Sequence, residues 1–111
     1  MAAQFELKKS KNGKHFFNLL ATNGEIILTS QMFMSIAGAR KGIASVQSNS
    51  GVADRYERRQ GKGGKSHFVL KSGNHRVIGT SETYNSKANM EKGIKSVMKN
   101  GKVKKTVIVS G

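Results

Sequence analysis

The second half of this chain repeats the first half. Residues 5–52 align with residues 56–103 at a constant offset of 51 positions, without a gap, and 19 of the 48 paired residues are identical. Self-similarity at a fixed period constrains the architecture more strongly than any local pattern does. Positions that match between the repeats therefore carry the fold, and positions that differ are where a function could have been added.

The length of the chain limits it to one compact domain. A chain of 111 residues has room for one domain, and each repeat alone would be marginal, as domains below roughly 60 residues are. We therefore expect a single pseudo-symmetric domain over residues 1–111, in which repeat one (4–53) and repeat two (55–109) share a core like a fused dimer. A monomer fits this arrangement, although the sequence leaves the oligomeric state open.

The composition restricts the chemistry that is available. The chain contains no cysteine, so disulfides and thiolate metal sites are excluded, and a reducing compartment such as the cytoplasm is expected. The N-terminus runs directly into a charged alternating segment without a signal peptide. No apolar run approaches the roughly 20 residues that a membrane span needs. We expect no cofactor, no metal, no membrane contact and no small-molecule substrate.

The net charge of +14 points to an anionic partner. Twenty lysines and arginines stand against six acidic residues, and such an excess is informative about partners and not about fold. Residues 4–52 hold six basic and two acidic residues, a net of +4, whereas residues 55–103 hold twelve and three, a net of +9. Repeat two is therefore the more electropositive half.

Each repeat reads as three short strands, a helix and a further strand. In repeat one, alternation of apolar and polar residues predicts strands over 5–8, 15–21 and 25–30. Ser35 and Ser86 have the position of helix N-caps. The segment 103–110 is a strong strand pattern, and a terminal strand of this kind could pair with the other repeat. Gly42 and Gly93 fall inside the helices, where glycine costs about 1 kcal/mol against alanine, so we expect close packing of each helix on the sheet.

The motifs of both repeats resemble those of a known family. Repeat one carries Phe5-Glu6-Leu7, Phe17-x-Leu19, Asn23-Gly24-Glu25-x-Ile27, Thr29-Ser30 and Gly42-Ile43-x-Ser45-Val46-x-x-Asn49. Repeat two carries Tyr56-Glu57, Phe68-x-Leu70, Asn74, Ile78, Thr80-Ser81-x-x-Tyr84-x-Ser86-Lys87 and Gly93-Ile94-x-Ser96-Val97-x-x-Asn100. This pattern resembles the YegP-like family of small bacterial tandem-repeat proteins, which is largely of unknown function.

The resemblance implies a fold and no catalytic residues. It implies an α+β protein in which two tandem β3-α-β repeats form one shared, mainly antiparallel sheet, with the helices on one face and with swapped C-terminal strands. The chain departs from a typical member in its heavy load of lysine and arginine. Repeat one also has Phe33 and Ile36 where Tyr84 and Lys87 of repeat two hold the usual pattern.

Three groups of cations are the candidate binding residues. Two lie around glycine-containing hairpin turns, one in each repeat, and the third lies at the start of the predicted terminal strand. Long cationic side chains on such tips can follow a phosphate backbone, although they can also serve to protect the edges of a sheet. The candidate nucleic-acid-binding residues are Lys8, Lys9, Lys11, Lys14, Arg55, Arg58, Arg59, Lys62, Lys65, Lys102, Lys104 and Lys105.

An enzyme is not expected from these residues. The three histidines are scattered, and none of them recurs in the other repeat. Glu6 and Glu57 are the one repeated pair of carboxylates and could form a symmetric acid–base site. Ion pairing with the neighbouring lysines explains that pair better.

We therefore interpret the chain as a non-enzymatic nucleic-acid-binding protein. Contacts from hairpin tips suit the shape and the phosphates of structured RNA better than base reading in DNA. The predicted partner is ribosomal RNA, and the predicted role is that of a ribosomal or ribosome-associated protein. The alternatives are a protein-interaction or stress-associated module with an acidic partner, and a nonspecific DNA-binding protein.

Overall fold

The computed structural model describes residues 2–109, which form seven strands, two α-helices and two short 3₁₀ turns. The strands are short and the two helices have equal length. In chain order, the elements are β1 (Gln4–Lys9), β2 (His15–Leu20), β3 (Ile26–Ser30), α1 (Ile36–Asn49), η1 (Ala53–Arg55), β4 (Tyr56–Gln60), η2 (Lys62–Gly64), β5 (Ser66–Lys71), β6 (Val77–Thr80), α2 (Lys87–Asn100) and β7 (Thr106–Ile108).

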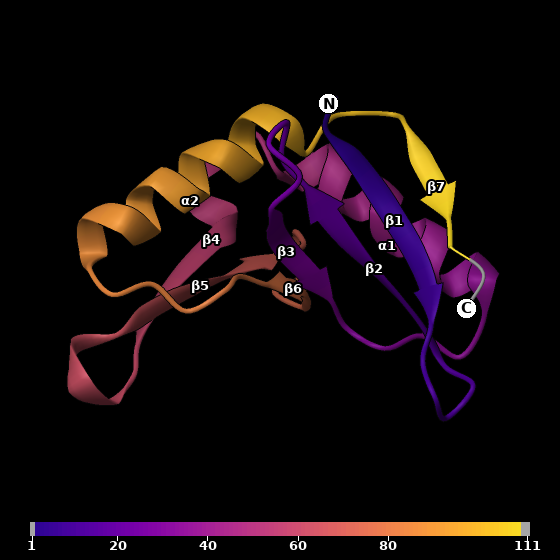
Figure 1. The fold of residues 1–111 in the computed structure, drawn as a ribbon, viewed down its shortest axis with the longest axis horizontal. Helices are drawn as coiled ribbons and strands as arrows, with labels where there is room; N and C mark the ends of the chain where they lie inside the picture. The colour runs from indigo at the N-terminus through magenta and orange to yellow at the C-terminus, as the bar shows by residue number, and fades with distance from the viewer. Residues whose placement is uncertain (1, 110–111) are drawn as a thin grey trace.

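All seven strands belong to one sheet in the order β4-β5-β6-β3-β2-β1-β7 (Figure 1). The two repeats join where β3 pairs antiparallel with β6, and Thr29 lies opposite Thr80. These two threonines occupy the same position in the two repeats, since they are 51 residues apart. The pseudo-twofold axis of the molecule therefore passes through this pair.

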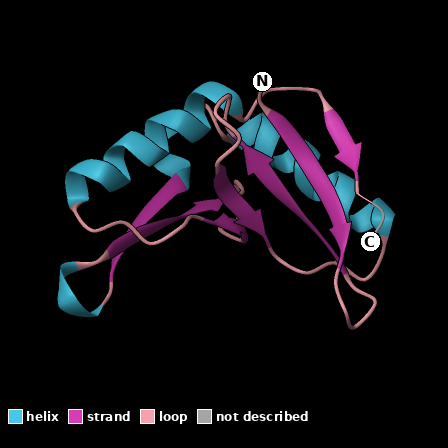
Figure 2. Ribbon diagram, viewed as in Figure 1, coloured by secondary structure: helices cyan, strands magenta, loops and turns pink. Residues whose placement is uncertain are grey.

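The predicted fold class is confirmed. The sheet is antiparallel except at its end, where β7 of repeat two lies parallel to β1 of repeat one and pairs Phe5 with Thr106. Both helices cover the face of the sheet that carries the buried apolar side chains (Figure 2). The exchange of a terminal strand occurs once, because the residues of repeat one that correspond to β7, 55–57, lead into and begin β4.

The predicted last strand, 103–110, is shorter in the structure. β7 spans only Thr106–Ile108, and Ser110 lies outside the described residues. Backbone bonds continue on both sides of the named strand, because Phe5 N donates to Lys105 O and Val109 N donates to Leu7 O, each over 2.9 Å. Residues 103–105 serve as the exit from α2.

Both helices begin at their predicted caps and end near their predicted asparagines. The Ser35 and Ser86 hydroxyls accept hydrogen bonds from the backbone N–H groups of Gly38 and Asn89. The glycines inside the helices lie where each helix packs closely on the sheet, as expected. A Cβ at Gly42 would lie 2.6 Å from Phe33 Cζ and 2.9 Å from Phe17 Cε2, so aromatic rings rest directly on the helix backbone.

Each repeat contributes one stacked aromatic pair and one edge-to-face aromatic pair to the packing of the core. Phe17 stacks on Phe33 with ring centroids 6.1 Å apart, and its edge meets Phe5. The equivalent trio in repeat two is Phe68, Tyr84 and Tyr56. Ile36, the first residue of α1, lies outside this core and is 42% exposed.

Near the pseudo-twofold axis, the two repeats differ in side-chain size. A Cβ at Gly79 would meet Leu28 Cγ at 2.9 Å, and Leu28 and Gly79 are equivalent positions. A Cβ at Gly51 would likewise meet Lys102 Cε at 2.9 Å, and these two are also equivalent. Gly101 and its equivalent Ser50 show the same relation. At Leu28/Gly79 and Ser50/Gly101 only one repeat can carry a side chain, since the two would occupy the same space, whereas the flexible end of Lys102 can move away from Gly51.

The second hairpin turns differ in backbone strain. Gly24 takes φ of 84° in repeat one, and His75 takes φ of 67° at the equivalent position. Histidine adopts this left-handed region less readily than glycine does. The turn of repeat two therefore carries its backbone strain on the histidine.

We expect the Gly79→Ala variant to lose about 1–3 kcal/mol of unfolding free energy, because the new methyl group overpacks the space that Leu28 fills. In a Leu28→Ala background the same change should cost at least about 1 kcal/mol less, since neighbouring sites couple. Gly73→Ala is the control, because its Cβ would meet nothing closer than 3.5 Å. Urea denaturation of the unchanged protein, the two single variants at Gly79 and Leu28 and the double variant measures the coupling. Additive losses of unfolding free energy would contradict the shared-space explanation.

We expect Tyr56 to make the fold sensitive to alkali. The buried Tyr56 hydroxyl donates to Ser50 O over 2.6 Å, and burial raises its pKa well above the ordinary value. Above about pH 10 the unfolded phenol loses its proton while the folded one keeps it, so stability falls as the pH rises. Tyr56→Phe, which matches Phe5 of repeat one, should lose less unfolding free energy as the pH rises in this range. If the unfolding free energy of this variant depends on pH between 8 and 11 as steeply as that of the unchanged protein, the role of Tyr56 is contradicted.

Candidate functional site

The two predicted basic hairpins lie at opposite ends of the molecule. The β1–β2 turn carries Lys11 and Lys14, and the β4–β5 turn carries Lys62 and Lys65. Figure 1 shows the two turns at the two ends of the longest axis, which extends over 36 Å. Gly13 takes φ of 80° in the first turn, as expected for a glycine in such a hairpin. The two clusters are therefore separated along the longest axis of the molecule.

Several of the predicted cations are engaged within the protein. Lys8 Nζ lies 3.5 Å from Glu6, and Arg55 Nε donates to Asn49 Oδ1 over 3.1 Å. Arg58 holds Glu91 of α2 through two nitrogens of its guanidinium. These side chains stabilise the edges of the fold as well as adding charge.

Glu57 organises the charges on the outer face of the second hairpin. Lys71 Nζ donates to one of its oxygens over 2.8 Å, and Arg59 holds the other oxygen. Hydrogen bonds from Lys71 and then Arg59 lower the pKa of this carboxyl group. Glu6 and Glu57, the repeated carboxylates, are thus both in ion pairs, which was the interpretation preferred over an acid–base site.

The third basic cluster lies at the end of α2. The Lys102 side chain covers Gly51, so it takes part in the packing near the pseudo-twofold axis. Lys104 and Lys105 are exposed in the connection to β7. The assignment of the three clusters as binding residues stays a prediction.

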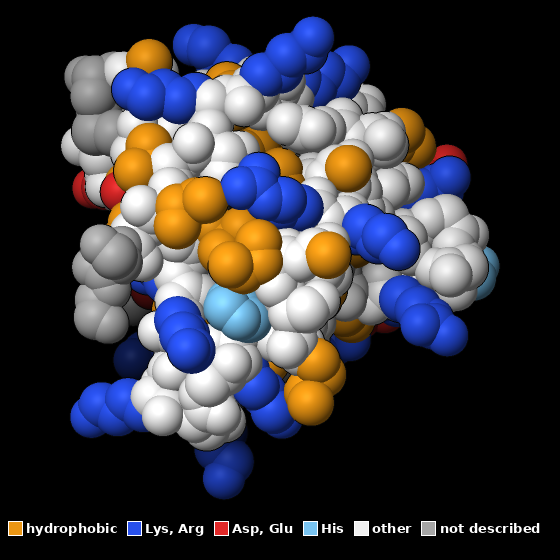
Figure 3. All heavy atoms as spheres, turned by 90° about the vertical axis from the view of Figure 1, so that its right-hand side faces the viewer, with side chains coloured by type: hydrophobic (Ala, Val, Ile, Leu, Met, Phe, Trp, Pro, Cys, Tyr) orange, Lys and Arg blue, Asp and Glu red, His pale blue; other side chains and the backbone are white. Residues whose placement is uncertain are grey.

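A hollow with apolar walls lies beside β7, and it was not predicted from the sequence. It has a volume of about 260 Å³ and is lined by Leu7, Lys8, Lys9, His15, Ile36, Ile108 and Val109. In Figure 3, which views the end of the molecule on the right of Figure 1, hydrophobic side chains gather next to a histidine, with lysine and arginine side chains around them. The wall residues come from β1, β2, α1 and the β7 segment, which the fold brings together.

The connection before α1 adds further apolar side chains. Met32 is 53% exposed and Met34 is 83% exposed, while Ile36 and Ile108 are 42% and 54% exposed. We call Met32, Met34, Ile36, Ile108 and Val109 the apolar patch. Several exposed apolar side chains on neighbouring segments indicate an interaction site more than a single exposed residue does.

The three residues of the apolar patch that precede or begin α1 are apolar in repeat one alone. At the positions equivalent to Met32, Met34 and Ile36, repeat two has Thr83, Asn85 and Lys87. The buried Leu7 beneath the patch corresponds to Arg58, whose ion pair with Glu91 lies on the matching surface of repeat two. Comparing the repeats could have revealed this surface, since three alternate positions change from polar to apolar together. Of the three, only Ile36 was noted from the sequence.

Within residues 2–109, no strand pairs with the outer edge of β7. β7 ends the sheet, and Lys105 O and Val109 N are bonded to β1. Because backbone groups alternate along a strand, the N–H and C=O groups of Thr106 and Ile108 point away from β1. An extended segment could bond to these groups while its side chains reach the apolar patch.

A metal centre and a membrane-spanning helix are both missing from the part of the chain that the structure describes. Residues 2–109 contain no group of three or more histidine, cysteine, aspartate or glutamate side chains placed to hold a metal ion. Within the same residues, no helix has the length and apolarity needed to cross a bilayer.

Comparison with known proteins places both repeats in one family. The family model described as "Domain of unknown function (DUF1508)" matches residues 10–57 and again residues 62–107. The chain belongs to this family. The two matches also bear out the resemblance to YegP-like tandem-repeat proteins that the motifs indicated.

Relatives cover nearly the whole chain. The UPF0339 protein YegP of Yersinia pestis is 55% identical over 97 residues, 87% of each chain. The solution NMR structure of a UPF0339 protein from Shewanella oneidensis matches with a TM-score of 0.91 at 46% identity, covering 97% of this chain and 92% of that one. The solution NMR structure of yegP from E. coli matches with a TM-score of 0.93 at 45% identity, covering 100% and 96%.

The prediction of an RNA-binding or ribosomal protein is wrong. The relatives are UPF0339 and YegP proteins, and the E. coli structure is described as a protein of unknown function. None of these names is that of a ribosomal, RNA-binding or DNA-binding protein. The prediction relied on the +14 charge and on compositional likeness to ribosomal proteins, and composition alone does not identify a partner.

We expect the exposed residues of the apolar patch to contribute little to stability. A Met32→Thr/Met34→Asn/Ile36→Lys variant, which copies repeat two, should change the unfolding free energy by no more than about 1 kcal/mol in total. Leu7→Ala is the contrasting variant, because Leu7 is 2% exposed and its truncation should cost about 2–5 kcal/mol. Thermal and urea unfolding measure both. A large loss in the triple variant would mean that the patch is part of the core.

Proposed function

We propose that the protein is a non-enzymatic protein-binding module whose apolar patch docks an extended segment of another protein. One observation carries this proposal: repeat one exposes Met32, Met34 and Ile36 where repeat two has polar residues on the same scaffold. A fold that needed these side chains would have kept them in both repeats. Their presence in one repeat only favours a function added to that repeat.

The apolar character of the patch suits a protein partner. Full burial of one aliphatic or methionine side chain contributes about 1.5–3 kcal/mol, so a few side chains suffice for a transient complex. Methionine adapts its flexible side chain to the shape of the partner, which is why it recurs on binding surfaces. The contacts come from apolar residues, and the basic hairpins are not needed for them.

The open edge of β7 favours a partner that is extended. Strand addition supplies main-chain hydrogen bonds to Thr106 and Ile108, and alternate side chains of the added strand fill pockets beside the edge. The hollow lined by Leu7, Ile36 and Ile108 is such a pocket. A second copy is a poor occupant, because two chains of charge +14 repel each other.

The arrangement of titratable groups supports a binding role over catalysis. His15 is in the hollow beside the patch, His67 is on β5 and His75 is in a turn, so the three histidines lie on separate elements. The repeated carboxylates are held in ion pairs. The proposal includes the cytoplasm as location, which the cysteine-free composition suits.

A photo-crosslinking residue at position 34 tests the proposal in cells. We expect position 34 to yield adducts with another protein and the equivalent position 85 to yield none. Adducts at position 34 should disappear when Ile36→Lys and Ile108→Lys are also present. Equal yields from positions 34 and 85, or adducts that survive these two changes, would contradict docking at the patch.

The crosslinked peptide then gives a quantitative test. The segment should be extended, with apolar residues at alternate positions, and a synthetic copy should bind the purified protein in calorimetry. The Met32→Thr/Met34→Asn/Ile36→Lys variant should bind it at least about tenfold more weakly, because each buried side chain contributes more than about 1.4 kcal/mol. An unchanged affinity would exclude the patch.

A further inference from the structure

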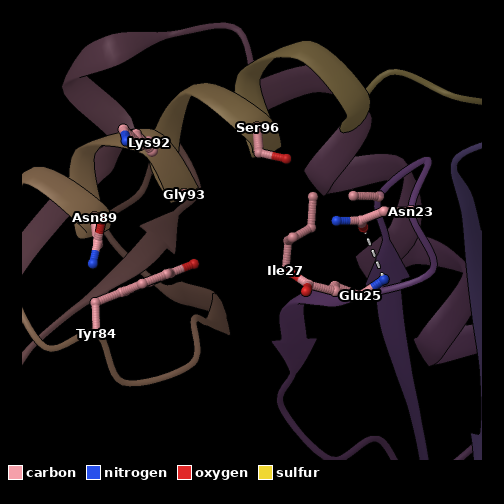
Figure 4. Close-up of a pocket in the computed structure, with 9 residues that line it drawn as sticks. Asn23, Glu25, Ile27, Tyr84, Asn89, Lys92, Gly93 and Ser96 are labelled. Carbon is pink, nitrogen blue, oxygen red and sulfur yellow. Dashed lines mark hydrogen bonds between the residues drawn. The ribbon is translucent and has the colours of Figure 1, made fainter.

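A second cavity lies between the repeats, and it shares no residue with the apolar patch. It is a cleft of about 300 Å³, which is at the lower end of the range for small-molecule sites. The turn after β2 forms one wall, and α2 with the segment before it forms the other (Figure 4). The lining residues are Ala21, Asn23, Glu25, Ile27, Tyr84, Asn89, Lys92, Gly93 and Ser96.

Three hydrogen-bond donors face this cleft. Asn23 Oδ1 accepts from the backbone N–H of Glu25 over 3.0 Å, so its amide nitrogen stays available to donate. Ser96 Oγ accepts from Asn100 Nδ2 over 3.3 Å and keeps its own proton. In Figure 4, the Tyr84 hydroxyl and the Ser96 hydroxyl both point into the space between α2 and Ile27. The cleft therefore offers donors on both walls.

The Tyr84 side chain is fixed and protonated. Its ring stacks on Phe68 with centroids 6.3 Å apart and covers Gly93, which leaves no space for a side chain there. Burial, and then the charges of Glu82 and Glu25, raise the pKa of this phenol. The hydroxyl therefore remains a donor at neutral pH.

The border between the cleft and an adjoining depression is acidic, although the chain as a whole is strongly basic. Glu6, Glu57 and Glu91 form ion pairs, whereas Glu25 and Glu82 form none within residues 2–109. These two glutamates both border a shallow depression next to the cleft. A free carboxylate in a chain with twenty cations attracts a cationic group of a ligand.

The equivalent place in the other half of the molecule lacks these groups. The positions that correspond to Glu25, Tyr84 and Asn89 hold Arg76, Phe33 and Gly38. The charge is reversed and the phenol is absent, while the packing residues Ile27/Ile78 and Gly42/Gly93 are retained. The carboxylate and the phenol of the cleft thus lie where the repeats differ, whereas Asn23, Lys92 and Ser96 have identical counterparts in Asn74, Lys41 and Ser45.

We propose that this cleft binds a small zwitterion, a molecule the size of a free amino acid that carries an ammonium and a carboxylate. The ammonium faces the Glu25 carboxylate, and the carboxylate accepts from the hydroxyls of Tyr84 and Ser96. Ala21 and Ile27 give an apolar floor between the two ends. Lys92 at the rim adds positive charge on the side of the ligand carboxylate.

NMR titration of the ¹⁵N-labelled protein tests this inference with glycine, L-serine and L-glutamine as probes. At least one of them should produce saturable shifts confined to the amides of residues 21–27 and 84–96. Acetate and methylammonium, which carry one charge each, should produce no saturable shift there. Saturation by either single-charge probe, or none by any of the three zwitterions, would overturn the proposal.

Variants at positions where the repeats differ show which residue contacts the ammonium of the ligand and which contacts its carboxylate. Glu25→Gln should raise the dissociation constant of the zwitterion that binds by about tenfold or more, since the ligand ammonium then meets a neutral acceptor in place of a carboxylate. Tyr84→Phe should raise it by a smaller factor, and the ring of Phe33 at the equivalent position shows that the scaffold accepts this change. Arg76→Gln is the matched control and should have no effect. Unchanged binding in Glu25→Gln, or an equal loss in Arg76→Gln, would overturn the assignment.

Discussion

The structure depends on a narrow junction between two similar sheets. β3 and β6 share only two residue pairs in register, Thr29 with Thr80 and Ser30 with Gly79. So few backbone bonds cannot hold two halves of this size together, and the shared core has to do so. The helices provide it, because α1 contacts strands of both repeats and α2 contacts both β5 and β3.

The helices reach that core because glycine replaces a side chain where each one approaches the sheet. Phe33 and Phe17 occupy the space beside Gly42, and Tyr84 and Phe68 occupy the space beside Gly93. The helical cost of glycine is therefore offset by stacked aromatic pairs whose rings could not otherwise approach so closely. Near the pseudo-twofold axis, the two repeats cannot carry identical side chains at positions such as Leu28 and Gly79, because the Leu28 side chain fills the space beside Gly79.

Much of the fold was predictable because the repeat gave each pattern twice. The caps at Ser35 and Ser86, the glycine turn at Gly13 and the close approach at Gly42 each follow from local chemistry. The relative placement of the hairpins depends on how the two halves join, which no local pattern encodes. The same reason explains why the hollow beside β7 was missed: Leu7, Ile36 and Ile108 come together only when the last strand pairs with the first.

The predicted binding residues were chosen for charge, and charge alone does not separate cations that pair within the fold from cations that have no acidic partner there. Arg58, Arg59 and Lys8 have acidic partners within the fold, so a count of cations overstated what is free to bind. Comparison of equivalent positions was more informative. It separates Met34 from Asn85 and Tyr84 from Phe33 on scaffolds that are otherwise alike.

The pairing of β7 with β1 has a consequence for the order in which the chain folds. Phe5 and Thr106 lie 101 positions apart in the sequence, yet they are neighbours in the sheet. During synthesis the first strand is made early, and its partner emerges only after both helices are complete. Contacts between such distant segments slow folding. Before β7 pairs with it, the edge of β1 is exposed to other chains. Lys8 and Lys9 at the end of β1 oppose pairing with those chains.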